Sequence, residues 1–131
     1  PTMGELTKAA ETRVETLKPP IRSFVEAKVR TIVGQTTASD DQLFSECRAL
    51  GDQARDVAEV AGAAGMEAIG EVCLGISAMV DGWTRQGIWR VDALRVHLHA
   101  LTLVNQSTSE DNTKSVLERL KLMRRSIGIN D

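Results

Sequence analysis

Two histidines, His97 and His99, are the only side chains of this chain whose charge ordinarily changes near neutral pH. Both lie in a segment with helical periodicity, whose apolar face is formed by Leu94, Leu98 and Leu101. At about 100° per residue, His97 falls beside this face and His99 on the opposite side. Because the two imidazole rings then point roughly 160° apart in a regular helix, we expect them not to share a metal ion.

The two histidines have different expected roles. We expect His97 to be a boundary or core residue that hydrogen-bonds across the helices. His99 is interpreted as a solvated surface residue or, alternatively, as a phosphoryl acceptor, with His97 as the second candidate. A phosphohistidine site needs a neutral nucleophilic nitrogen, open access and a cation to hold the phosphate. Arg95, one helical turn before His99, is the cation available for that role.

Other catalytic patterns are absent from the sequence. It has no glycine-rich phosphate loop after a strand, no Ser-His-Asp pattern and no zinc-ligand spacing, so we expect no cofactor and no metal. Cys47 and Cys73 are too few for a disulfide framework, and both fall in apolar stripes as small buried residues. Three pairs of carboxylates are interpreted as helix-capping or solvated groups: Asp40 with Asp41, Glu67 with Glu71, and Glu110 with Asp111.

The composition is that of an ordinary globular protein. Of the 131 residues, 42% are hydrophobic and 26% are charged, and the formal net charge is −2. This charge, with no Tyr, two Phe and two Trp, argues against a basic face or a stacking platform for nucleic acid. No apolar run approaches the roughly 20 residues that cross a bilayer, so we expect no membrane insertion. The first residues lack a signal-peptide pattern, and a cytoplasmic location is expected.

The spacing of apolar residues predicts helices throughout and no strand. Helices are expected over residues 3–18, 20–33, 40–61, 66–82, 90–105 and 110–127. Pro19-Pro20 is expected to end the first of these, which has an apolar stripe over 6–17, because proline lacks an amide hydrogen and crowds the preceding turn. The N-caps are expected at Thr2, Ser39 and Ser109. The sequence therefore predicts one all-α domain over residues 1–131, an antiparallel bundle of five or six helices.

Residues 61–73, Ala-Gly-Ala-Ala-Gly-Met-Glu-Ala-Ile-Gly-Glu-Val-Cys, end one helical pattern and begin the next. This stretch resembles the junction after the phosphoryl-carrying helix of bacterial histidine phosphotransfer (HPt) domains, and the resemblance is specific over 52–80. Aligning Gly65-Met66 with the last glycine of the family motif puts Arg55 where the phosphorylated histidine stands. Ala58 and Glu59 then replace its Lys-Gly. Residues 91–101 are similar to a segment of small HPt-like proteins that tend to lack the usual histidine.

The resemblance implies an all-α fold, an antiparallel four-helix HPt-like bundle with additional terminal helices. It favours a signalling module that binds a response-regulator receiver domain or a histidine kinase, in two-component or chemotaxis signalling, without itself carrying phosphate. The expected partner-binding residues are Arg55, Glu59, Gly62 and Gly65. An arginine side chain stays protonated and cannot act as the nucleophile there.

Two other functions stay open. One is an active phosphotransferase of a phosphorelay that uses His99 or, less favourably, His97. The other is a structural homodimer of two bundles. In that case Gly62, Gly65 and Gly70 serve only close helix packing, whereas in a binding module they form a shallow patch for another protein.

Overall fold

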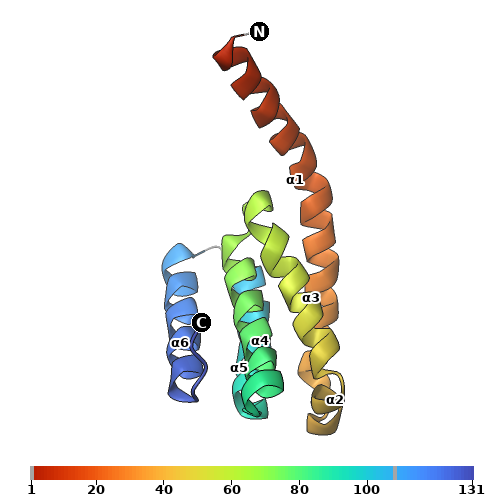
Figure 1. Cartoon of the computed structure of the whole chain (residues 1–131), viewed down its shortest axis with the longest axis vertical. Helices are drawn as coiled ribbons and strands as arrows, with labels where there is room; N and C mark the ends of the chain where they lie inside the picture. The colour runs from red at the N-terminus through yellow and green to blue at the C-terminus, as the bar shows by residue number, and fades with distance from the viewer. Residues whose placement is uncertain (1, 108) are drawn as a thin grey trace.

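The computed structural model describes the backbone of residues 2–107 and 109–131, and the side chains of these residues except those of 6–16. All regular structure in the described part is helical, which confirms the all-α prediction. The elements are α1 (Met3–Val33), the 3₁₀ helix η1 (Gly34–Thr37), α2 (Asp40–Ser45), α3 (Cys47–Val60), the 3₁₀ helix η2 (Ala61–Ala64), α4 (Glu67–Gln86), α5 (Val91–Gln106) and α6 (Glu110–Ser126). Figure 1 shows α4 between α3 and α6.

The predicted break at Pro19-Pro20 is wrong, because α1 continues through both prolines. Proline has a backbone φ that a helix accepts, and its cost is a missing hydrogen bond and a clash that bends the helix. Figure 1 shows α1 changing direction partway along, with its N-terminal end lying away from the other helices. The capping box of Thr2 and Glu5 is confirmed, with hydrogen bonds of 3.1 and 3.2 Å. The apolar stripe predicted for 6–17 lies almost wholly outside the described side chains, and Leu17 is exposed.

The predicted helix over 40–61 is interrupted at Glu46, where α2 ends and α3 begins. Glu46 has φ −103° and ψ 8°, outside helical values. Its position allows α2 to meet α5, where the Arg95 guanidinium bonds to the Asp40 carboxylate at 2.7 Å. The same guanidinium donates to the carbonyls of Thr36 and Ala38. A long-range contact of this kind leaves no local signal in the sequence.

Helix α4 is the central element, packed against α3, α5 and α6, and it runs past its predicted end at residue 82. Gly82 lies inside the helix, and a Cβ at this position would stand 2.9 Å from the Ile129 side chain, so glycine allows Ile129 to pack there. The helix ends instead at Gly87, whose φ of 72° suits glycine. Cys47 and Cys73 are buried as predicted, and burial raises the pKa of the Cys73 thiol to about 12.

Three of the four aromatic side chains form one cluster beside α2. The ring centroid of Phe44 lies 5.2 Å from those of Trp83 and Trp89, and the two indoles are 6.1 Å apart. These tilted and edge-on arrangements are favourable for aromatic pairs. In the described part of the chain, no helix has the length and apolar character needed to cross a membrane.

Candidate functional site

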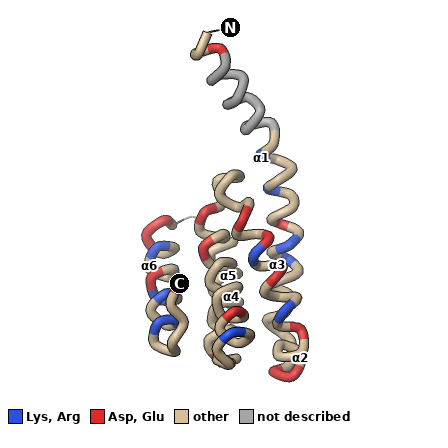
Figure 2. The backbone as a smooth tube through the Cα atoms, viewed as in Figure 1, with Lys and Arg blue, Asp and Glu red and all other residues tan. Residues whose placement is uncertain are grey.

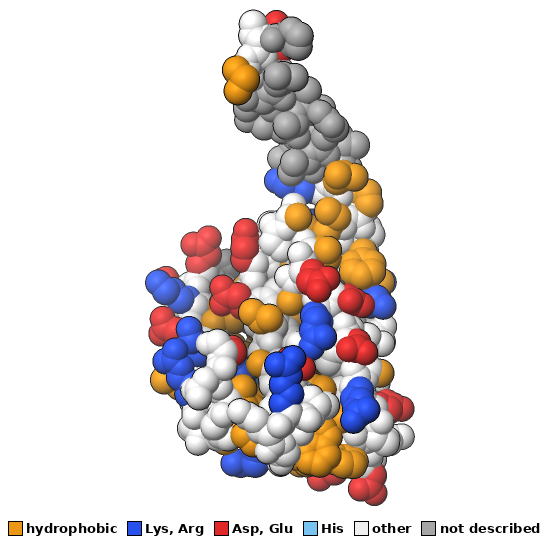
Figure 3. Space-filling model, viewed as in Figure 1, with side chains coloured by type: hydrophobic (Ala, Val, Ile, Leu, Met, Phe, Trp, Pro, Cys, Tyr) orange, Lys and Arg blue, Asp and Glu red, His pale blue; other side chains and the backbone are white. Residues whose placement is uncertain are grey.

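A shallow groove of about 520 Å³ runs between α3 and α4, and it brings together three of the four predicted partner-binding residues. Arg55, Glu59 and Gly62 line it from the α3 side. From the α4 side it is lined by Glu67, Gly70, Glu71, Leu74, Ser77 and Asp81. Figure 3 shows hydrophobic side chains among charged ones on the face formed by these two helices. Gly65 does not line this groove and lies instead at a second hollow.

Glycine is present at positions 62, 65 and 70 for different structural reasons. At Gly70 a Cβ would stand 3.1 Å from the Ala61 Cβ, so this glycine allows α4 to approach η2. Gly65 has φ 74° in the turn before α4, a conformation that favours glycine. A Cβ at Gly62 would meet nothing within 4 Å, so packing does not explain this exposed glycine. Close packing therefore accounts for Gly70, and Gly62 leaves the groove open.

Two residues that the sequence did not single out define the middle of the groove. Leu74 is 54% exposed, although the other large apolar side chains of α4 are mostly buried. Ser77, one turn further on, is only 4% exposed and lines the groove. The Ser77 hydroxyl has no hydrogen-bond partner among the described residues, and its oxygen is not sealed from the surface. A leucine on the polar side of the predicted helix was the one signal available beforehand.

The groove has an excess of negative charge, with four carboxylates and one guanidinium. The guanidinium of Arg55 pairs with Asp81 at 3.0 Å, and both side chains are partly exposed. Within the described part of the chain, Glu59, Glu67 and Glu71 form no ion pair. Glu67 and Glu71 are exposed, as the sequence predicted, but they lie on the rim of the groove.

His97 is fully buried and is held on both sides of its ring. Its Nε2 lies 3.0 Å from Nη1 of Arg124, and its Nδ1 lies 2.8 Å from the carbonyl oxygen of Ala93. Because arginine can only donate, Nε2 must accept, and the ring proton therefore sits on Nδ1 and is donated to Ala93. Arg124 in turn makes a two-pronged pair with Asp131, at 3.1 and 2.9 Å.

This environment keeps the His97 imidazole neutral. Burial, supported by the positive charge of Arg124, lowers the pKa of His97 to about 4. The Ala93 carbonyl and the Asp131 carboxylate act in the opposite direction and do not offset it. The prediction of a core histidine bonded across the helices is therefore confirmed. A buried ring with both nitrogens engaged is not accessible to a phosphoryl donor.

His99 is exposed on the other side of α5, so the two histidines point apart as predicted. Its expected cation is engaged elsewhere, since Arg95 binds Asp40 and the carbonyls before α2. Among the described residues, no group of three or more His, Cys, Asp or Glu side chains could hold a metal ion.

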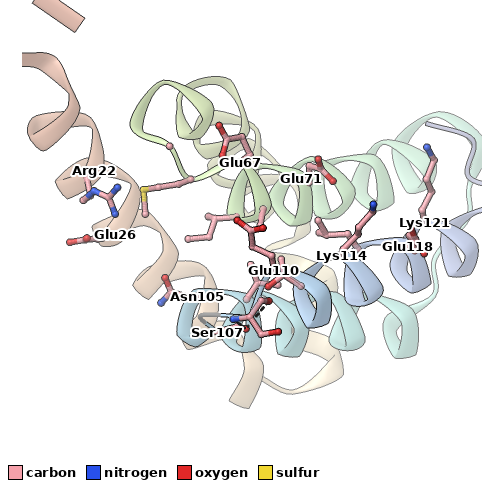
Figure 4. A pocket seen from close by; sticks show the side chains of 18 residues that line it. Arg22, Glu26, Glu67, Glu71, Asn105, Ser107, Glu110, Lys114, Glu118 and Lys121 are labelled. Carbon is pink, nitrogen blue, oxygen red and sulfur yellow. Dashed lines mark hydrogen bonds between the residues drawn. The ribbon is translucent and has the colours of Figure 1, made fainter. Parts of the chain in front are cut away.

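A larger hollow of about 790 Å³ lies between α6 and the helices α1, α4 and α5. Arg22 lines it and donates to the carbonyl of Ala64 at 2.9 Å. Figure 4 shows its charged side chains spread along the hollow, with Glu67 and Glu71 on α4 and Lys114 and Lys121 on α6. In a small-molecule site, a few polar groups converge on one point. The charged groups of this hollow do not.

Comparisons with known proteins add no relative to this description. No protein-family model, no curated protein and no solved structure matches the chain. The α3–α4 groove and the two histidines are therefore the observations from which a function has to follow.

Proposed function

We propose that this chain is an HPt-like signalling module that works in the cytoplasm and binds a response-regulator receiver domain or a histidine kinase without carrying phosphate. The observation that supports this is the groove between α3 and α4, where Arg55, Glu59 and Gly62 surround the exposed Leu74. Protein-binding surfaces have an apolar centre within a polar rim, and Leu74 among the charged residues of the groove has this arrangement. The position of Arg55 in the HPt resemblance then suggests the class of partner.

Three side chains support the proposed absence of phosphate transfer. Arg55 cannot act as a nucleophile, because its guanidinium remains protonated. His97 is buried with both ring nitrogens engaged. His99 is exposed, but Arg95, the cation expected one turn before it, is bound to Asp40. The α5 surface thus lacks the arrangement that would hold a phosphate beside His99.

Binding can be tested with purified receiver domains and histidine kinases from the host, by calorimetry or by NMR titration. Leu74→Ala removes the exposed centre of the groove and should weaken binding by about tenfold, as truncation of a central contact residue does. Leu103→Ala is the matched control, because Leu103 is 59% exposed but lies on α5, outside the groove. Equal loss in both variants, or binding that is unchanged by Leu74→Ala, would contradict the proposed surface.

Phosphate transfer can be tested with radiolabelled phosphorylated receivers and active kinases. The expected result is a complex without phosphate on this chain. Acid-labile phosphate that disappears in His99→Ala would overturn the proposal and establish the phosphotransferase alternative. A doubled mass in solution without affinity for any receiver or kinase would instead support the structural homodimer.

A further inference from the structure

We infer that the surface that docks in the α3–α4 groove is basic, with an apolar side chain that covers Leu74 and with Lys or Arg side chains that face Glu59, Glu67 and Glu71. This inference rests on the groove of the proposed function and adds the chemistry of what binds there. It applies to the partner's contact segment, whichever protein carries that segment.

The first argument is the unpaired charge. Glu67 and Glu71 are one helical turn apart on α4, and like charges at this spacing destabilise a helix. Glu59 adds a third carboxylate from the α3 side of the groove. The single guanidinium of the groove does not neutralise them, because Arg55 pairs with Asp81. Cationic side chains of a partner would remove this repulsion on binding.

The second argument is the hydroxyl of Ser77. This side chain is only 4% exposed in the wall of the groove, and the described part of the chain offers its oxygen no hydrogen-bond partner. The oxygen is not sealed from the surface, so it is open to a hydrogen-bond donor that enters the groove. Its lone pairs can accept a hydrogen bond from the ammonium or guanidinium group of a partner.

The third argument is the order of these groups along the groove. Figure 2 shows acidic residues gathered at the end of the bundle where α3 ends and where α4 and α6 begin. Glu59, Glu67 and Glu71 belong to that end, Leu74 follows in the middle, and the Arg55–Asp81 pair lies beyond it. The bound segment is therefore expected to place its cationic side chains towards η2 and its apolar anchor between η2 and Asp81.

The experiment uses the full chain and two designed amphipathic helical peptides with identical leucines, one with flanking lysines and one with glutamates in their place. NMR titration should show that only the lysine peptide binds, with shifts centred on Leu74, and that its affinity falls as salt is raised. The double variant Glu59→Gln/Glu71→Gln should weaken binding by about 3- to 10-fold, as expected for the loss of two exposed ion pairs. The control Asp41→Asn/Glu46→Gln changes the net charge equally at two exposed residues outside the groove and should leave affinity unchanged.

Ser77→Ala provides a second measurement. It should lower affinity for the lysine peptide by about threefold, as expected for one lost hydrogen bond. The midpoint of urea unfolding should stay the same or rise, since alanine is a better helix former than serine. Equal binding of both peptides, or equal weakening by the two double variants, would show nonspecific attraction and overturn the inference.

The outcomes separate this inference from the proposed function. If a receiver or kinase binds through Leu74 but neither the glutamate variants nor competing lysine peptide affect it, the inference fails and the proposed function stands. If the lysine peptide binds at the groove while no receiver or kinase does, the basic chemistry stands and the proposed class of partner fails.

Discussion

Burial of the His97 imidazole against the Arg124 guanidinium couples the stability of this protein to pH. The folded state lowers the pKa of His97 from 6.5 to about 4, so folding favours the neutral ring. This contribution is complete above pH 6.5 and is lost as the pH falls towards 4, and it amounts to at most roughly 3 kcal/mol. We expect urea unfolding between pH 7.5 and 4 to show this loss. His97→Gln, which cannot titrate, should lack the part of the slope that lies between pH 6.5 and 4, and equal slopes would contradict the assignment.

Gly75 is the residue of α4 that makes space for the same guanidinium. A Cβ there would stand 3.0 Å from Cζ of Arg124 and 3.3 Å from Cδ2 of His97. We therefore expect Gly75→Ala to destabilise the protein by about 1–3 kcal/mol, even though alanine favours a helix. Gly34→Ala is the control, since nothing lies within 4 Å of its added Cβ and its φ is −56°. This control should be neutral or should stabilise by up to about 1 kcal/mol in thermal or urea unfolding.

Among the elements, α6 depends on a buried polar contact for its position on α4 and α5. Arg124 is the charged residue of α6 that is buried, and it joins His97 on α5 to Asp131 beyond the helix. Arg124→Met would leave the Nε2 of His97 without its donor, at a cost of about 2–3 kcal/mol. Hydrogen exchange should therefore accelerate in α6 more than in α3. The exposed neighbour Arg125 gives the control, and Arg125→Met with the same effect would exclude the buried contact as the cause.

Helix α4 is expected to become more stable when the repulsion between Glu67 and Glu71, on the rim of the groove, is removed. Glu71→Lys places a lysine four residues after Glu67, so a repulsive pair becomes an attractive one at the favourable i, i+4 spacing. This change should raise the free energy of unfolding by about 0.5 kcal/mol. It should also weaken binding of a basic segment, so stability and affinity move in opposite directions. Parallel urea unfolding and peptide titration would check this, and a variant that is less stable, or that binds the lysine peptide more tightly, would contradict the account of the rim.

The helical elements were predictable to the extent that their signals are local. The capping boxes at Thr2 and Ser39 and the N-cap at Ser109 appear where the sequence predicts them. Most described residues of the predicted apolar stripes are buried, but Leu17, Phe24 and Phe44 are exposed. The boundaries that failed depend on tertiary contacts. Helix α2 ends early where it meets Arg95 of α5, and Gly82, predicted to mark a turn, is instead a helical glycine against which Ile129 packs.

At the scale of the whole molecule, the site was predictable in part. Helical spacing and the HPt resemblance identified Arg55, Glu59 and Gly62, which line one groove. The same reasoning treated Glu67 and Glu71 as ordinary solvated residues and did not select Leu74 or Ser77. Their significance depends on how α3 lies against α4, on which helix faces stay uncovered and on where charges find partners. None of these is a property of one segment.

The cluster of Phe44, Trp83 and Trp89 is an intrinsic fluorescence probe at the end of the bundle where α4 ends. The chain has no tyrosine, and its two indoles, 6.1 Å apart, lie together beside Phe44, so near-ultraviolet emission comes from a single place. Trp83 is roughly 24 Å along α4 from Glu67, at the 1.5 Å rise of a helix residue. Contacts made only at the acidic end should leave the emission unchanged. A change of colour or intensity on binding would therefore report contact or movement at the Asp81 end of the groove, two residues from Trp83.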